Sequence, residues 1–285
     1  MTASSKPLLA LLALFCAAAP SSRAAEPVKS KVDVIDLLRQ GQVDLFLNPK
    51  AVPCDPPENV FQARDGELRI SGAGFGYLAT RQAYRNYHLV LEFKWGPRTW
   101  GQREKRARDN GILVHAYGPH GAYGETFMAS IEAQIIEGGM GDFLVLGATL
   151  PDGTRLDTRL DCEYELDRDG EKRWRRGAPR QTVRDGRVNW EQRDEDWEDR
   201  IGFRGAFDPD APAGGWNRME VIARDDTLLC RFNGRVVNEG FAAQPKEGRV
   251  CIQTEGAEMI VRRFELWPLG TFKETWPPEP PAAAK

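Results

Sequence analysis

The sequence predicts an all-β protein, built as a sandwich or barrel. The clearest sign is the stretch YHLVLEFKW at 87–95, where apolar and polar residues alternate with the period of a half-buried strand. The second sign is a series of short apolar runs separated by Gly, Pro and Asn-Gly, without an internal repeat or a long amphipathic helix. A chain of 285 residues is long enough for one large β domain after removal of a leader.

The first 24 residues have the features of a secretory signal peptide. Lys6 provides a basic start, positions 8–15 are apolar, and the tripeptide SRA at 22–24 is an acceptable cleavage site. The apolar run is too short to cross a bilayer as a helix. We therefore expect an exported protein, periplasmic or extracellular, with no membrane insertion once the leader is removed. An uncleaved N-terminal anchor is the alternative.

The rest of the chain divides into an extension at 25–43, one β domain at 44–269 and a Pro/Ala-rich tail at 270–285. A short helix is expected at 32–38, and Asn233-Gly234 predicts a type I′ hairpin turn. Strands are expected at 67–72, 77–80, 87–95, 111–117, 131–136, 143–149, 216–224, 228–232, 236–237, 250–256 and 259–269.

Residues 161–200 stand apart because 13 acidic and 10 basic residues fall within this segment. Such a composition contributes little to a core, so a solvated hairpin excursion with short polar strands is expected. The alternative is a lid over a cleft, with Trp174, Trp190 and Trp197 as rings that stack on sugars.

Charge and cysteine content exclude some classes and leave others open. The chain has 39 basic and 42 acidic residues and a net charge of −3, which gives no electrostatic basis for binding nucleic acid. Cys54, Cys162, Cys230 and Cys251 could form disulfides in an exported protein, in any of three pairings. They could equally serve as small buried apolar residues.

The most informative stretch is 131–143, IEAQIIEGGMGDF. In a strand, Glu132 and Gln134 point to one face and the apolar residues between them point to the other. Glu137 joins Glu132 only if a β-bulge near 135–136 turns it. Two carboxylates in one cleft can have separated pKa values and work as acid and base. The alternative is that Glu132 and Gln134 only bind neighbouring strands.

Histidines and the acid after the glycines supply further candidates. His115 ends a predicted strand and is an alternate base, whereas His120, in the following loop, and Asp142 are candidate substrate ligands. Glu132, Asp142 and His115 are suitable ligand types for a divalent cation, so such a cation is a candidate cofactor. Their spacing is not diagnostic, and no metal ligand is assigned.

A second polar cluster lies near the C-terminus, where Gln253 and Glu255 share one strand face and are candidate substrate ligands. Ion pairs with the nearby arginines at 262–263 are the alternative. Trp100 and Tyr117 are candidate stacking rings for pyranose sugars.

Several blocks of the chain, taken in order, resemble the 3-keto-disaccharide hydrolase family. They are NYHLVLEFKW, DNGILVH, IEAQIIEGGMGDF, WNRMEV, FNGRVVNEG and IQTEGAEMIVRRFELWPL. The match covers residues 44–269, interrupted at 161–200. The resemblance implies a concanavalin A-like jelly roll of two packed antiparallel sheets. It also implies an oligosaccharide or glycoside as partner.

The resemblance implies 3-keto-glucoside 1,2-lyase or 3-keto-2-hydroxyglucal hydratase activity. This chemistry needs a base for the C2 proton, an acid for the leaving oxygen and donors for the enolate. We expect Glu132 and Glu137 as the acid/base pair and Gln134 as a donor. A carbohydrate-binding module without catalysis is one alternative. A laminarinase-like hydrolase is the other, although Gln134 stands where its E-x-D-x-x-E strand has the middle acid.

Overall fold

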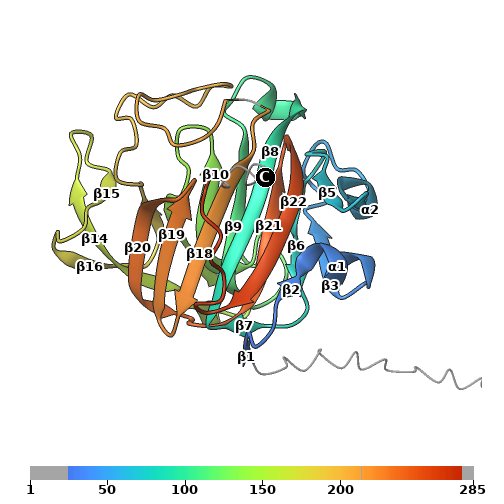
Figure 1. The fold of residues 1–285 in the computed structure, drawn as a ribbon, viewed down its shortest axis with the longest axis horizontal. Coiled ribbons are helices and arrows are strands. Elements are labelled where there is room, and N and C mark those ends of the chain that lie inside the picture. The colour runs from blue at the N-terminus through green and yellow to red at the C-terminus, as the bar shows by residue number, and fades with distance from the viewer. Residues whose placement is uncertain (1–24, 213, 278–285) are drawn as a thin grey trace, which may run out of the picture.

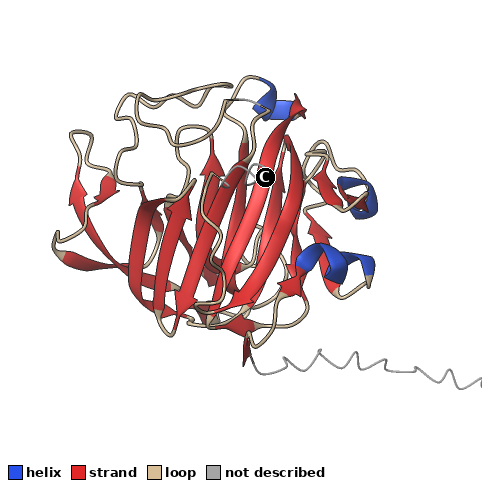
Figure 2. Cartoon of the chain, viewed as in Figure 1, coloured by secondary structure: helices blue, strands red, loops and turns tan. Residues whose placement is uncertain are grey.

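Two antiparallel β-sheets pack face to face and form the body of the molecule (Figure 1). The structure is a computed structural model that describes residues 25–212 and 214–277. Strands dominate, and helices are few and short (Figure 2). The predicted all-β sandwich of two antiparallel sheets is therefore confirmed. The expected signal peptide at 1–24 and the end of the expected tail lie outside the described residues.

The smaller sheet has seven strands, all paired antiparallel. In spatial order they are β17 (Gly186–Val188), β11 (Phe143–Leu146), β10 (Ala129–Ile136), β9 (Asp109–Tyr117), β21 (Arg249–Glu255), β6 (Phe75–Thr80) and β3 (Val43–Leu47). Strands far apart in the sequence are thus neighbours, because β21 lies between β9 and β6.

The larger sheet has eleven strands and lies nearer the viewer in Figure 1. Its main path is β15 (Lys172–Trp174), β14 (Arg159–Leu166), β20 (Arg235–Gln244), β19 (Thr227–Phe232), β18 (Asn217–Arg224), β8 (Tyr87–Thr99), β22 (Ala257–Pro268), β5 (Glu67–Ile70) and β4 (Phe61–Arg64). Off this path, β16 (Arg180–Val183) pairs with β14, and β2 (Val32–Asp33) pairs with β22.

Small elements complete the fold. Two further pairs are β1 (Glu26–Pro27) with β7 (Tyr84–Arg85), and β12 (Ala148–Thr149) with β13 (Arg155–Leu156). The helices are α1 (Val34–Arg39), α2 (Pro57–Val60) and a 3₁₀ turn, Gly101–Glu104. Helix α1 begins where the Asp33 carboxylate accepts the N–H of Ile35 at 2.9 Å, as an N-cap does. Within the described ranges, no helix is long and apolar enough to cross a membrane.

The core lies between the two sheets, and β8 shows how the sequence builds it. The apolar residues of its alternating stretch are all buried: Tyr87, Leu89, Leu91, Phe93 and Trp95. They face the apolar side of the smaller sheet within one continuous cluster. Burying a side chain of this size contributes about 1.5–3 kcal/mol, so the predicted alternation places a large part of the stabilising surface.

Residues 161–200 are more closely integrated than the predicted solvated excursion. Strand β14 extends the larger sheet by pairing with β20, and β17 extends the smaller sheet by pairing with β11. Trp174 and Trp190 are 3% and 0% exposed, so the expectation that their rings stack on sugar is wrong. Trp197 is partly buried and donates from Nε1 to the Glu137 carbonyl oxygen at 2.8 Å.

Two smaller expectations can be checked directly. The type I′ turn is present, because Asn233 and Gly234 have φ values of +46° and +80°. The four cysteines of the described residues are free, and three of them are buried: Cys162, Cys230 and Cys251.

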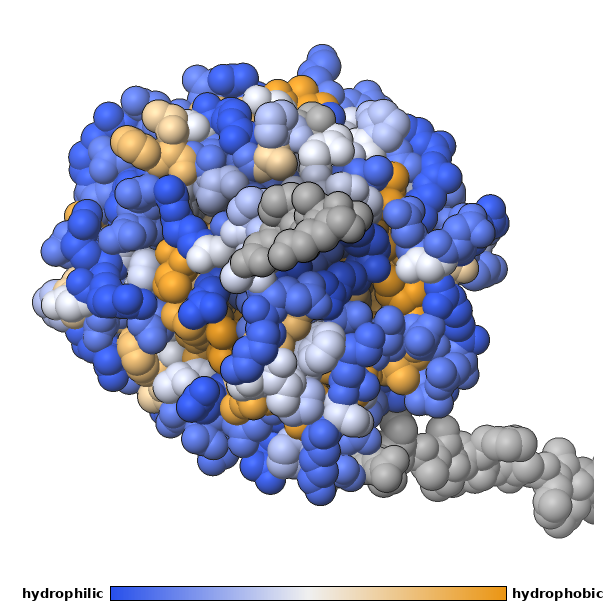
Figure 3. All heavy atoms as spheres, in the orientation of Figure 1, coloured by the Kyte–Doolittle hydropathy of each residue, from blue (hydrophilic) through white to orange (hydrophobic). Residues whose placement is uncertain are grey.

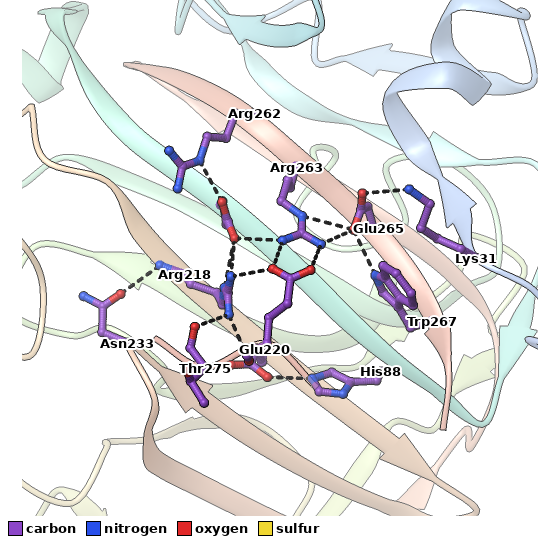
Figure 4. A network of polar contacts seen from close by, with 12 residues as sticks. Lys31, His88, Arg218, Glu220, Asn233, Arg262, Arg263, Glu265, Trp267 and Thr275 are labelled. Atoms are coloured by element: carbon purple, nitrogen blue, oxygen red, sulfur yellow. Dashed lines mark hydrogen bonds and ion pairs between the residues drawn. The ribbon is translucent and has the colours of Figure 1, made fainter. Parts of the chain in front are cut away.

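The outer face of the larger sheet carries a dense ionic network. Glu92 accepts hydrogen bonds from Arg218 at 2.6 Å, Arg262 at 2.7 Å and Arg263 at 3.3 Å. Beside it, His88 Nε2 lies 2.6 Å from Glu220 Oε2 (Figure 4). Hydrophilic residues cover most of this side of the molecule (Figure 3). The acids and arginines of this network therefore neutralise one another on the outer face of the larger sheet.

Candidate functional site

The outer face of the smaller sheet carries the predicted polar strand. Ile131, Ala133 and Ile135 of β10 are buried in the core between the sheets. Glu132 and Gln134 alternate with them and therefore point to the opposite, outer face, as predicted. Partnered residues of an antiparallel pair share a face. The outer face therefore also presents the partners of Glu132 and Gln134 on β9, which are Leu113 and Gly111.

The missing side chain of Gly111 leaves a gap on the outer face of β9, in which side chains from β10 and β21 meet. A Cβ atom at Gly111 would stand 2.2 Å from both Glu132 Oε1 and Gln253 Oε1. Any larger residue would thus push these two side chains apart. Glycine at this position brings Glu132 and the Gln253 amide together across the intervening strand.

Three carboxyl groups gather around this gap. Asp109 begins β9 and Glu255 ends the antiparallel β21, and both lie on the outer face near Glu132. Arg103 forms an ion pair with Asp109 and lies 3.7 Å from Glu255. Gln134 Nε2 donates to Asp109 Oδ1 at 2.8 Å. The three acids come from adjacent strands, and few cationic side chains lie near enough to neutralise them; Arg103 faces two of the three.

Burial and mutual repulsion shift the protonation of these acids. Burial, and then the charge of Asp109, raise the pKa of Glu132 to about 8, against the lowering effect of Arg187. Burial and the same charge raise the pKa of Glu255 well above its ordinary value. Burial also raises the pKa of Asp109, although Arg103 opposes this. Glu132 therefore exchanges its proton nearer to neutral pH than an ordinary glutamate does.

Two buried amides on this face have unused hydrogen-bonding capacity. Gln253 is fully buried, and the contact of its amide with the Glu132 carboxyl lowers the pKa of Glu132 but falls short of a well-aligned hydrogen bond. Within the described residues, Gln134 Oε1 has no hydrogen-bond partner. Buried polar atoms normally have partners, so these amides point to a polar ligand such as a sugar.

Glu137 does not lie beside Glu132, and this expectation is wrong. The pairing of β10 with β9 runs unbroken from Ile131 to Ile136, without the bulge expected near 135–136. Glu137 instead accepts from Arg108 Nη1 at 2.6 Å and from the backbone N–H groups of Arg108 and Gly202. It is an anchor between two loops.

His115 also faces away from the carboxyl cluster, so its role as an alternate base is corrected. It has a φ of +54° and lies where both neighbouring strands slip in register against β9. Its ring is fully buried, meets the edge of Tyr87 from the other sheet, and lies 2.9 Å from the Pro245 carbonyl oxygen. Burial lowers its pKa to about 4, which leaves the ring neutral.

Asp142 is fully enclosed, so it does not reach a substrate as expected. Its carboxylate pairs with Arg193 and with Arg187 at 3.2 Å, and accepts the N–H of Trp190 at 2.7 Å. It orders the segment after β17. Arg187 is thereby fixed where its charge also acts on Glu132.

The remaining candidates lie around the rim of the same face. His120 Nδ1 is 2.7 Å from the hydroxyl of Tyr77. Tyr77 of β6 is the residue paired with Gln253 of β21. Trp100 donates to the Ser71 carbonyl oxygen at 2.9 Å beside the end of β21. The Tyr117 hydroxyl lies 3.3 Å from Thr158 Oγ1, at the end of β9 away from Asp109.

Three residues of the cluster carry no signal in the sequence that predicts their place in the site. Asp109 and Arg103 lie between the strands expected at 87–95 and 111–117, and Arg187 belongs to the charged segment 161–200. Their proximity to Glu132 depends on the pairing of β9, β10, β11 and β17. The described residues contain no group of three or more His, Cys, Asp or Glu side chains arranged so that they could hold a metal ion.

Solved structures with a related fold come from carbohydrate-binding and carbohydrate-cleaving proteins. A protein of Parabacteroides distasonis, provisionally described as a glycosyl hydrolase, is 16% identical, with a TM-score of 0.43 over 80% of this chain and 89% of that chain. The β-glucanase of Bacillus licheniformis is 9% identical, with a TM-score of 0.39 over 79% and 89%. These TM-scores are too low to bear on the chemistry of the site.

Sequence comparison gives the more specific result. No curated protein matches the chain. The family model described as a 3-keto-alpha-glucoside-1,2-lyase-like domain matches residues 48–266.

Proposed function

The chain belongs to the 3-keto-alpha-glucoside-1,2-lyase-like family, and we propose that it cleaves α-glucosides whose glucose unit carries a ketone at C3. The observation that supports this most is the buried Glu132 carboxyl, whose pKa of about 8 suits a base, held against the Gln253 amide over Gly111. A base whose pKa lies near the working pH removes protons most effectively.

The proposed reaction begins with proton transfer from carbon. The C3 ketone acidifies the C2 proton, and the Glu132 carboxylate takes it. The electron pair moves onto the C3 oxygen as an enolate, which the Gln253 amide and the Arg187 guanidinium stabilise. Gln134 keeps Asp109 in place through its 2.8 Å hydrogen bond.

The second half of the reaction breaks the glycosidic bond. The enolate collapses, the C1–O1 bond breaks, and the leaving oxygen takes a proton from Glu255, whose raised pKa keeps it protonated. The products are the free alcohol and an unsaturated 3-keto sugar. Addition of water to that double bond would complete a net hydrolysis.

This route also fits the residue at the centre of β10. A covalent glycosyl intermediate needs two carboxyl groups at a fixed separation across the bond. Gln134 cannot act as such an acid, and Glu137 is bound to Arg108 and Gly202. Elimination needs only a base, an acid and donors for the enolate.

The test compares matched α-glucosides with and without C3 oxidation. We expect the purified protein to release the aglycone only from the oxidised member of each pair. Glu132→Gln should lower kcat at least 100-fold without loss of folding, whereas Glu165→Gln, at an exposed position, should leave it unchanged.

Two outcomes would overturn the proposal. Equal release from the unoxidised glycoside would indicate an ordinary hydrolase. Binding of the 3-keto-glucoside without any release would indicate a carbohydrate-binding module.

A further inference from the structure

Arg103 is a cation of the carboxyl cluster to which the proposed reaction gives no role. It lies in the 3₁₀ turn Gly101–Glu104, between β8 and β9, and its side chain is 12% exposed. The loop is fastened to the end of β21, because the Trp100 N–H donates to the Gly256 carbonyl oxygen at 2.7 Å. A Cβ atom at Gly256 would crowd Arg103 Cγ at 3.0 Å, so the glycine leaves room for the arginine.

The Arg103 guanidinium contacts two acids from adjacent strands. Its Nη2 forms an ion pair with Asp109 and lies 3.7 Å from Glu255 Oε2. Gln134 Nε2 also donates to Asp109, at 2.8 Å. Asp109 therefore has two donors close by, whereas the guanidinium lies farther from Glu255. Donors stabilise the ionised form of a carboxyl group, so these contacts favour the charge on Asp109 and the proton on Glu255.

Asp199, from the charged segment 161–200, holds the other side of the guanidinium. Its Oδ1 accepts from Arg103 Nη1 at 3.4 Å and from the Ala107 N–H at 3.1 Å. Arg103 Nη1 also donates to the Ala107 carbonyl oxygen at 3.2 Å. The two Nη nitrogens thus have separate partners, the carboxyl cluster for one and the loop and Asp199 for the other. The rigid fork of a guanidinium can span both sides, which the compact ammonium of a lysine cannot.

We propose that Arg103 is a positioning residue that keeps Asp109 ionised beside Glu255, so that the proton these two acids share lies on the acid that serves the leaving oxygen. The inference rests on the proposed function, which takes Glu255 as that acid. Two neighbouring carboxyl groups hold one proton more readily than they hold two charges. Once Glu255 has given up its proton both acids are charged, and Arg103 lies beside both of them.

Other charged groups also face this acid pair from the elements packed around it. They are Glu132 of β10, Arg187 of β17 and Asp199 behind the guanidinium. Glu132 and Asp199 oppose ionisation of the pair, whereas Arg187 and Arg103 favour it. Arg103 is the cation in direct contact with the pair, and a change at this residue should therefore have a large effect on the pair's protonation.

The kinetic test measures kcat and kcat/KM on a 3-keto-α-glucoside as a function of pH. Arg103→Gln should lower kcat at least tenfold, because the charge that forms on Glu255 is no longer stabilised. The fall in kcat/KM at high pH, where Glu255 loses its proton, should move up by about 1–3 pH units. Arg103→Lys keeps the charge and should leave this fall near its wild-type pH. The control is Arg106→Gln, in the same loop but 52% exposed, which should change neither quantity.

A second variant keeps the test decisive if Arg103→Gln does not fold. Asp199→Asn retains an oxygen that can accept from Arg103 and Ala107 but removes the negative charge. The charge of Arg103 then acts on the acid pair alone, so the fall in kcat/KM should move to lower pH, opposite to the effect of Arg103→Gln. A fall that stays at the wild-type pH in both variants would overturn the inference.

A carbon-13 NMR titration of the carboxyl groups makes the result independent of turnover. In the free wild-type protein Asp109 should titrate below Glu255, and in Arg103→Gln the pair should hold its proton to higher pH. An unchanged titration would overturn the inference even if kcat falls, since Arg103 would then act only on the fold. A wild-type protein that cleaves no 3-keto-α-glucoside would instead overturn the proposed function, and the titration would still decide whether Arg103 holds the pair.

Discussion

At the scale of single residues, the pH dependence of the proposed reaction depends on the ionisation of Glu132. Its carboxylate must be deprotonated to act as the base, and its pKa is raised to about 8. We therefore expect kcat/KM to rise tenfold per pH unit below 8, and to fall again at the higher pH where Glu255, the acid, loses its proton. A pH–rate profile measures this, and activity that falls through pH 8 would make Glu132 the acid instead.

The position of the rising limb should depend on Asp109. Its negative charge is the second cause, after burial, of the raised pKa of Glu132. In the variant Asp109→Asn the limb should move to lower pH, because ionising Glu132 no longer opposes a like charge. A purely structural role for Asp109 would lower the rate without moving the limb.

Gly111 is a second residue whose effect can be predicted. The change Gly111→Ala puts a methyl group within 2.2 Å of the present positions of Glu132 Oε1 and Gln253 Oε1. Both side chains would have to move, and the activity on a 3-keto-α-glucoside should fall at least tenfold. Thermal unfolding should change little, since only side-chain ends are displaced. The control is Ala116→Gly, which tests for a general loss of rigidity in β9. Gly153→Ala would not serve as a control, because Gly153 has a φ of +86°, where a residue with a side chain is strained.

At the scale of elements, the side-chain orientation is predictable from the sequence in β10 but not in the turn that follows it. Alternation alone predicts which face Glu132 takes, since the core admits only the apolar set. No comparable alternation determines where the side chains of the following turn point. Glu137 is positioned by Arg108 and Gly202, which are 29 and 65 residues away in the sequence. Contacts of that kind cannot be deduced from local spacing, which is why the expected acid/base pair was wrong.

The corrected role of Glu137 predicts a stability effect. The change Glu137→Ala leaves Arg108, whose side chain is 13% exposed, without its 2.6 Å partner. Breaking a buried ion pair costs about 3–5 kcal/mol, which urea unfolding would detect. The matched control is Glu198→Ala, which breaks an exposed pair with Arg200 and should cost under about 1 kcal/mol. A fully stable Glu137→Ala protein would contradict the anchoring role.

At the scale of the whole molecule, the sequence predicts the architecture better than the site. Strand periods and turn residues identify the sandwich. The acid cluster, however, needs Glu255 of β21 next to Asp109 of β9, and no local pattern specifies that pairing. The same limit applies to Trp190, which reads as an exposed ring in a charged segment but is enclosed between the sheets.

The C-terminal segment should stabilise the larger sheet without affecting the reaction. The Arg218 side chain is 1% exposed and donates to the carbonyl oxygens of Glu274 and Thr275 at 3.3 and 3.1 Å. A chain ending at residue 270 loses these bonds, and its free energy of unfolding should fall by about 3 kcal/mol. Because the carboxyl cluster lies on the other sheet, kcat should be retained. Glu274→Ala should cost less, since the backbone acceptors remain.

The position of β21 and β22 has a consequence for how the molecule is made. These consecutive strands enter the middle of different sheets, β21 between β6 and β9, and β22 between β5 and β8 (Figure 1). During synthesis, neither sheet can close until residues 249–268 have left the ribosome. Pairings between such distant segments fold slowly and leave strand edges exposed meanwhile. Asp109, Glu132 and Glu255 therefore come together only in the step that completes the sandwich, and a nascent chain lacks the proposed acid–base centre before it.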